Sequence, residues 1–201
     1  MGPFLLDKKI MNSEIKDKKT DLTKLYLKYI YCKECPLAKL GRSQVVFGDG
    51  NPNAKLMFIG EGPGKDEDFQ GKPFVGRAGQ LLTKIINAMG MTRKEVFISN
   101  VVKCRPPNNR TPTQEESETC KNLLLLKEID IIQPKIICTL GASATQALLG
   151  NEIKISTARG NFFKFKNMEI LPTFHPAYLL RNPEAKRVVW QDMQKIVEKL
   201  K

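Results

Sequence analysis

The sequence predicts an α/β fold in which one domain holds a four-stranded parallel sheet sandwiched between helices. The strands are predicted at four short apolar runs, which cover residues 55–60, 96–102, 135–141 and 168–174. Helical patterns lie between and after these runs, at residues 76–90, 113–132, 142–149 and 184–200. Strands that alternate with helices form parallel sheets. Because helices cover both faces of such a sheet, its strands read as continuous apolar runs.

The start of the chain differs from the rest. Residues 1–20 are rich in Lys and Asp and lack an apolar period, so we expect a flexible N-terminal extension and a folded domain over residues 21–201. A helical spacing of apolar residues begins at Leu22. We expect no signal peptide, because the first residues lack a cleavage-site pattern, and no apolar stretch reaches the length that spans a membrane.

The charge balance indicates a polyanionic partner. Lys and Arg number 33 against 21 Asp and Glu, which gives a formal net charge of +12. Such an excess favours nucleic acid, although a lysine-rich solvated surface gives the same balance. We expect a monomer.

Four of the five cysteines have the spacing of a metal centre. Cys32 and Cys35 form a CxxC pair, and Cys104 and Cys120 follow far downstream. A CxxC pair binds one metal centre, and two further thiolates complete a set of four, which suits zinc or an iron–sulfur cluster. An odd number of cysteines without an export signal favours reduced thiols and a cytoplasmic location. Cys138, inside the third strand, is predicted to be a small buried apolar side chain.

Unusual residues follow each predicted strand. In chain order they are the GEGPG sequence at residues 60–64, Asn100, the GAS sequence at residues 141–143, and His175 with Pro176. Ligands of parallel sheets bind at the carboxyl ends of the strands. The convergence of these residues therefore predicts one active site at that edge.

Each motif also has a structural interpretation. The glycine loop with Gly60 and Gly62 exposes backbone N–H groups to a ligand or forms a tight turn, and Glu61 can orient a water molecule. Asn100 offers a donor and an acceptor to a ligand or closes a turn. Phe74 stacks on a planar ligand or anchors its loop. A lone histidine such as His175 is catalytic or structural.

Two further segments have the chemistry of a phosphate or duplex contact. Ser143 opens a helix, where a hydroxyl and free N–H groups bind phosphate or the serine simply caps the helix. Leu179 and Leu180 precede Arg181, so this segment is an apolar wedge beside a phosphate-binding cation, or simply the start of the last helix.

In combination these motifs resemble the family 4 uracil-DNA glycosylases, the thermostable iron–sulfur type. The resemblance covers about residues 24–200 and rests on Cys32-x-x-Cys35, GEGPG with Glu67 and Asp68, GKPFVG at residues 71–76, NVVKCRPP at residues 100–107, Cys120, and HPAYLLR at residues 175–181. It implies a uracil-DNA glycosylase-like fold. It also implies hydrolysis of the N-glycosidic bond of uracil in DNA, as in base excision repair.

The resemblance further implies a cofactor and residue roles. A [4Fe-4S] cluster would be held by Cys32, Cys35, Cys104 and Cys120. His175 would donate a hydrogen bond to uracil O2. The superfamily's usual Asp is missing from the glycine loop, so Glu61 would position the attacking water, with Asp66 as the second choice. Phe74 would stack on the flipped uracil, Gly60 and Gly62 would let the backbone approach it, and Asn100 would bond its O4 and N3–H edge.

The DNA itself would be held by further side chains. Leu179 or Leu180 would fill the gap that the flipped base leaves. Phosphates would be contacted by Ser143, Arg181, Arg105 and Arg110. A rival interpretation is a non-enzymatic nucleic-acid-binding module with a zinc-stapled loop, and a second is a related glycosylase with broader base choice. The first rival explains the charge and the cysteines but not the strand-end residues.

Overall fold

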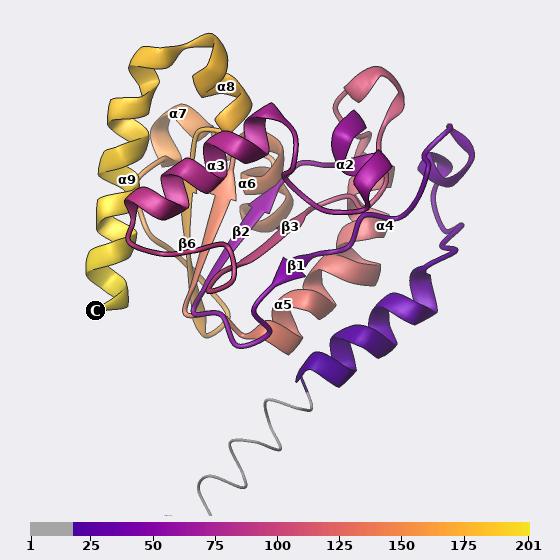
Figure 1. Cartoon of the computed structure of the whole chain (residues 1–201). Coiled ribbons are helices and arrows are strands. Elements are labelled where there is room, and N and C mark those ends of the chain that lie inside the picture. The colour runs from indigo at the N-terminus through magenta and orange to yellow at the C-terminus, as the bar shows by residue number, and fades with distance from the viewer. Residues whose placement is uncertain (1–17) are drawn as a thin grey trace, which may run out of the picture.

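The computed structural model describes residues 18–201 and forms an α/β fold around one mixed sheet (Figure 1). The strands are β1 (Asp49–Gly50), β2 (Leu56–Gly60), β3 (Phe97–Asn100), β4 (Ile136–Leu140), β5 (Phe163–Phe165) and β6 (Met168–Thr173). Their order in the sheet is β1-β3-β2-β4-β6-β5. The predicted parallel sheet is confirmed as the four central strands, which pair in parallel throughout.

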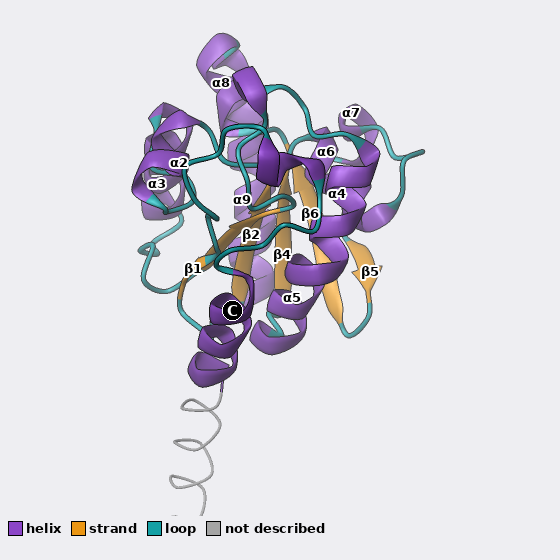
Figure 2. Ribbon diagram, turned by 90° about the vertical axis from the view of Figure 1, so that its right-hand side faces the viewer, coloured by secondary structure: helices purple, strands orange, loops and turns teal. Residues whose placement is uncertain are grey.

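Two short antiparallel strands at the sheet edges were not predicted. β1 pairs with β3 and β5 pairs with β6, and Figure 2 shows them at the two sides of the sheet. β1 has two residues, Asp49 and Gly50, and both are exposed. β5 has three residues, none of them fully buried. Runs this short and this exposed carry no continuous apolar signal, which is why the sequence predicts only the buried strands.

Helices cover both faces of the sheet. After a first helix over residues 18–29 come α2 (Lys65–Gln70), α3 (Arg77–Ala88), α4 (Gln114–Cys120), α5 (Leu126–Ile132), α6 (Ala142–Leu149), α7 (Ile155–Ala158), α8 (Pro176–Arg181) and α9 (Lys186–Leu200). Short 3-10 segments lie at Pro36–Lys39, Pro107–Asn109 and Pro183–Ala185, and a π-helical turn, Lys121–Leu125, joins α4 to α5. The predicted helix over residues 113–132 is thus continuous.

The strands divide their side chains between two cores. In β2, Met57 and Ile59 pack against the first helix, α5 and α6, whereas Leu56 and Phe58 pack against α3, α8 and α9. Figure 1 shows α3 and α9 on one side of the sheet and α4 and α5 on the other. Cys138 in β4 is completely buried in the second core, as predicted.

The predicted boundary of the N-terminal extension is only partly covered by the structure. Residues 1–17 lie outside the described residues, and with them the region in which a signal peptide would lie. Residues 18–20, which we assigned to the extension, lie in the first helix, where Lys18 Nζ donates to the Ile132 carbonyl 3.1 Å away. Within residues 18–201, no helix has the length and apolar character needed to cross a membrane.

Candidate active site and cysteine centre

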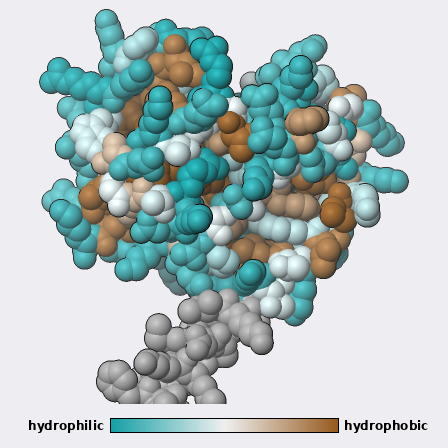
Figure 3. Space-filling view, viewed as in Figure 1, coloured by the Kyte–Doolittle hydropathy of each residue, from teal (hydrophilic) through white to brown (hydrophobic). Residues whose placement is uncertain are grey.

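A cavity of about 700 Å³ opens at the carboxyl ends of the central strands. It is lined by the glycine loop and α2 after β2, by Asn100 at the end of β3, by the start of α6 after β4, and by His175 with α8 after β6. In Figure 3 the surface is notched at the top, between the α3–α8 side and the α2 side. The expected convergence at one edge of the sheet is therefore observed.

Asn100 lies in this cavity with an unpaired oxygen. The residue is 2% exposed, and its Oδ1 is the buried side-chain polar atom that lacks a hydrogen-bond partner within residues 18–201. An unpaired buried acceptor costs about 1–3 kcal/mol, so its retention indicates a ligand donor. Gly60 makes the room: a Cβ there would lie 2.5 Å from this oxygen and 2.4 Å from Phe74 Cζ.

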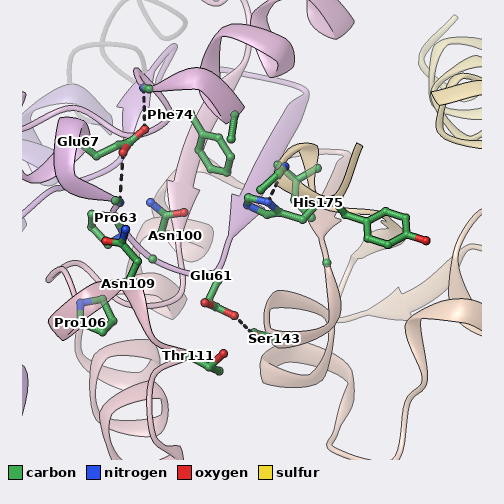
Figure 4. A pocket seen from close by; sticks show the side chains of 18 of the residues that line it. Glu61, Pro63, Glu67, Phe74, Asn100, Pro106, Asn109, Thr111, Ser143 and His175 are labelled. Carbon is green, nitrogen blue, oxygen red and sulfur yellow. Dashed lines mark hydrogen bonds between the residues drawn. The ribbon is translucent and has the colours of Figure 1, made fainter. Parts of the chain in front are cut away.

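Phe74 forms a wall of the cavity and is held in an unusual backbone conformation. Its φ is +54°, which is uncommon for a residue with a side chain. Arg93 donates to the Phe74 carbonyl at 3.0 Å and to the Pro73 carbonyl at 2.9 Å, and these bonds fix the loop. The Phe74 ring centroid lies 5.6 Å from that of His175. Figure 4 shows both rings and Asn100 around one space.

Glu67 ties the glycine loop to the Phe74 loop. Its carboxylate accepts hydrogen bonds from the backbone N–H groups of Gly64 at 3.2 Å and of Val75 and Gly76 at 2.9 Å each. We did not predict this role. Half of a sequence signal was present, because Glu67 lies three residues after the N-cap Gly64 and accepts its N–H, as the glutamate of a capping box does.

The hydrogen bonds of His175 define its tautomer. His175 is the N-cap of α8, and its Nδ1 accepts the Ala177 N–H at 3.1 Å. Burial lowers the pKa of His175 to about 4, with a smaller contribution from the Arg181 charge. At neutral pH the imidazole is therefore uncharged, and because Nδ1 is an acceptor, the proton is on Nε2. The side chain presents one N–H donor to the cavity.

Glu61 faces the same cavity from the glycine loop, and the Ser143 hydroxyl at the start of α6 donates to its carboxylate (Figure 4). The Ser143 hydrogen is therefore used within the protein. Asp66 lines the cavity from α2 and is exposed. Gly62 also lines the cavity, but its lack of a side chain serves packing, since a Cβ there would lie 2.7 Å from Val102 Cγ2.

The four expected cysteines surround a second, small cavity. Cys32, Cys35, Cys104 and Cys120 line it together with apolar side chains such as Val45 and Leu124. Arg42 donates to Cys104 Sγ at 2.6 Å, and the Lys103 N–H donates to Cys120 Sγ at 3.2 Å. These thiols come from the segment after the first helix, the segment after β3 and the end of α4.

Burial raises the pKa of three of these thiols, to about 11 for Cys104 and to about 12 for Cys120, and it also raises the pKa of Cys35. A metal centre must therefore displace their protons, and the nearby N–H donors then stabilise the thiolates. Within residues 18–201, no three Cys, His, Asp or Glu side chains are grouped as ligands of a single metal ion. The four thiols surround a cavity instead.

Comparison with known proteins agrees with this geometry. The family model for the uracil DNA glycosylase superfamily matches residues 47–195. The type-4 uracil-DNA glycosylase of Thermotoga maritima is 49% identical over 168 residues, which cover 82% of this chain and 86% of the relative. Those of Sulfurisphaera tokodaii and Saccharolobus solfataricus are 45% and 44% identical, over 88% and 84% of this chain and 84% and 82% of the relatives. The chain belongs to the type-4 group of the uracil DNA glycosylase superfamily.

Of the two leucines of α8 that were predicted to contact DNA, Leu179 is wrong. Leu179 is 1% exposed and packs in the core beneath α8, so it cannot enter a duplex. Leu180, the next residue, points outward and is 40% exposed. In a helix, adjacent positions face different sides, so only one of the two leucines is available. Arg181 is exposed and lines the cavity.

The two basic residues of the cysteine-linked loop are already paired. Arg110 donates to both carboxylate oxygens of Glu116, at 2.8 and 2.7 Å, and Glu116 in turn caps α4. Arg105 Nε donates to Asn109 Oδ1 at 2.8 Å. Arg110 therefore serves chiefly to hold its loop to α4, which the sequence did not indicate. Contacts of Arg105 and Arg110 with phosphates stay predictions.

Proposed function

We propose that this chain is a monofunctional uracil-DNA glycosylase, which flips uracil out of DNA and hydrolyses its N-glycosidic bond. The unpaired Asn100 Oδ1 supports this most strongly, because it is a free acceptor in a cavity that Phe74, Glu61 and His175 also line. The names of the relatives support the same activity. The product would be an abasic site, the substrate of the later steps of base excision repair.

Asn100 would distinguish uracil from cytosine. Its Oδ1 accepts from uracil N3–H, and its amide N–H₂ donates to uracil O4. Cytosine presents an acceptor at N3 and a donor at N4, so both contacts would oppose like groups. A site built to hydrogen-bond a substrate group rejects the analogue that lacks it, because buried polar groups are left unpaired. Phe74 would stack on the flipped ring, as aromatic side chains do on bases.

His175 would stabilise the leaving group. When the bond between sugar C1′ and uracil N1 breaks, the electron pair leaves with the base, and negative charge spreads to O2. The neutral imidazole donates from Nε2, which is the ring nitrogen not used by the Ala177 N–H. A fixed donor aimed at developing charge in a site sheltered from water is typically worth about two to three orders of magnitude in rate.

Glu61 would act on the sugar side of the reaction. Its carboxylate, held by Ser143, accepts a hydrogen bond from the attacking water and places negative charge near the cationic sugar. Water adds its oxygen to C1′, and the released proton passes to solvent. Asp66, which lines the same cavity but is exposed, remains the second candidate. Ser143 is thus proposed to orient Glu61. Because its one hydroxyl hydrogen is used there, the hydroxyl is not available to a DNA phosphate, which can only accept.

DNA would lie across the rim of the cavity. Leu180 would fill the space of the extruded nucleotide. Arg181, which has no hydrogen-bond or ion-pair partner within residues 18–201, would contact a phosphate. The net charge of +12 favours such a complex. A monomeric state and a cytoplasmic location remain proposals.

The cysteine centre would hold a [4Fe-4S] cluster. The ligands would be Cys32, Cys35, Cys104 and Cys120, because they line one cavity and supply the four sulfur donors that such a cluster takes. When bound, the cluster supplies a covalent link between three distant segments of chain. It would thereby hold the loop over residues 104–120 against DNA.

One experiment tests the function directly. The purified protein is incubated with an oligonucleotide that carries a single uracil, then treated with alkali, and strand scission at that position is measured. Matched oligonucleotides with cytosine or thymine at the same position are the controls. We expect scission only at uracil, together with release of free uracil. Intact strands after incubation with iron-loaded protein would contradict the proposal.

A further inference from the structure

A completely buried ion pair lies between the base-reading pocket and the cysteine centre. Lys103 and Glu128 each have no exposed side-chain surface, and Lys103 Nζ lies 2.7 Å from Glu128 Oε2. The ammonium also donates to Ser99 Oγ and to the main-chain carbonyl of Asn100, at 2.6 Å each. Its three N–H groups are therefore all used, and one of them donates to the backbone of Asn100, the residue proposed to recognise uracil.

Glu128 is equally well paired. Its Oε1 accepts the Tyr26 hydroxyl at 2.9 Å and the Gly48 N–H at 3.1 Å, and its Oε2 also accepts the Ser99 hydroxyl at 2.7 Å. Tyr26 lies in the first helix, which leads to Cys32, and Glu128 lies in α5, which continues the helix that ends at Cys120. The network thus holds the segments that the cysteines hold, but without a metal.

Stability alone does not account for this pair. Burying two charges costs several kcal/mol of desolvation for each ion, and well-packed apolar residues of similar volume are often as stable or more so. An apolar pair could not, however, donate a hydrogen bond to the Asn100 carbonyl. Since the Asn100 side-chain oxygen has no hydrogen-bond partner among residues 18–201, its direction depends on its own backbone and on the packing of Gly60 and Phe74.

We propose that Lys103, held in place by Glu128, is a positioning residue that fixes the backbone of Asn100 and so aims its amide at the uracil edge. This inference rests on the proposed function and adds a part to it. It assigns a role in base recognition to a lysine that never touches the base. Lys103 also donates its main-chain N–H to Cys120 Sγ, so the same residue connects the metal centre to the pocket.

The test uses the iron-loaded double variant Lys103→Met/Glu128→Gln. Both charges are removed together, and glutamine can still accept from Tyr26 and Gly48. We expect free uracil to bind about ten-fold more weakly. Binding of abasic-site DNA should change less than about two-fold, because uracil contacts Asn100 and abasic DNA has no base to do so. The decisive measurement is the same pair of changes in an Asn100→Ala background. If Lys103 acts through Asn100, they cause no further loss of uracil affinity there.

Controls separate positioning from stability. Met193→Ala removes a buried side chain of α9 that is not part of the network, and it should lower thermal stability without changing uracil affinity. Iron content is measured in every variant. Should the double variant fail to fold with its iron, Ser99→Ala keeps both charges and removes one shared partner, and a smaller loss of uracil affinity is expected, again absent when Asn100 is alanine.

Three outcomes overturn the inference. They are unchanged uracil affinity in a folded, iron-loaded double variant, equal losses with and without Asn100, and unchanged affinity in Ser99→Ala when the double variant does not fold. Failure of the proposed function is distinguishable, because the wild-type protein would then release no uracil from DNA. If only the positioning role of Lys103 is wrong, the wild type releases uracil and the variants bind uracil as it does.

Discussion

Asn100 and Lys103 are three residues apart in the chain, yet their surroundings differ in how far buried polar groups are paired within the protein. Asn100 keeps an unpaired oxygen in a cavity. Lys103 and Glu128 use every ammonium hydrogen and both carboxylate oxygens within the protein. An unpaired buried polar group is available to bind a ligand. Fully paired groups, here Lys103 and Glu128, form a rigid frame that orients the unpaired one.

The same contrast separates the two ends of His175. One ring nitrogen is used by the protein, because Nδ1 accepts the Ala177 N–H, while Nε2 has no hydrogen-bond partner in the part of the chain that the structure describes. The paired nitrogen fixes the ring, and the other is free for substrate. Substitutions on the unpaired side should therefore alter catalysis with little loss of stability. Those in the frame should lower stability, and should affect uracil binding only through the groups that they position.

The largest effect is expected for His175→Ala. Loss of the donor to uracil O2 should slow single-turnover excision about 100- to 1000-fold. Binding of abasic-site DNA should change little. Rapid-quench measurement of excision, with abasic-DNA affinity measured in parallel, tests both statements. Excision at the wild-type rate would remove His175 from the mechanism.

Asn100→Asp should come next. The carboxylate retains acceptors but loses the donor to uracil O4, so excision of uracil should fall about 100-fold and the preference over cytosine should shrink. Excision rates are compared on oligonucleotides that differ only in the target base. If selectivity stays as in the wild type, Asn100 does not read the edge.

Stability should depend on pH through His175. Its pKa is about 4 in the folded protein, lowered chiefly by burial, against about 6.5 in an unfolded chain. The unfolded state therefore takes up a proton at higher pH, and up to about 3 kcal/mol of stability, fully present above pH 6.5, is lost as the pH falls towards 4. Chemical denaturation across this range compares the wild type with His175→Asn, which keeps a cap acceptor but does not titrate. Identical pH profiles would contradict this origin.

The cysteine centre is tested by Cys104→Ala. We expect loss of most of the iron and a lower unfolding temperature, since one of four ligands and a link between distant segments are removed. Cys138→Ala is the matched control, because that thiol is buried in β4 away from the centre and should leave the iron unaffected. Iron and acid-labile sulfide are measured in both. Full iron content in Cys104→Ala would refute the ligand assignment.

The smallest effect is expected for Leu180→Ala. Removal of an exposed wedge should slow excision from duplex DNA about three-fold and leave stability unchanged. Leu179→Ala should instead cost about 2–5 kcal/mol of stability through a cavity in the core. Equal effects of the two substitutions on excision and on unfolding would show that α8 does not present Leu180 to DNA.

Much of this arrangement could be predicted from the sequence. Continuous apolar runs identify the four central strands, and parallel topology brings the residues that follow them to one edge, so Glu61, Asn100 and His175 meet in one cavity as expected. The CxxC spacing and two later cysteines likewise predict the convergence of four thiols.

The remainder depends on contacts that no local pattern encodes. In the sequence, Lys103 is indistinguishable from a surface lysine. Only the structure shows that it pairs with Glu128, which is 25 residues away in the chain. Arg93 reaches the Phe74 loop across 19 residues. The choice between Leu179 and Leu180 requires the rotation of a six-residue helix, which is too short to show a period.

A crystal structure with free uracil in the cavity tests the central claim most directly. It should show Asn100 Oδ1 about 2.7–3.2 Å from uracil N3, with His175 Nε2 at a similar distance from O2. Uracil bound in another orientation, with the Asn100 oxygen still unpaired, would contradict the account.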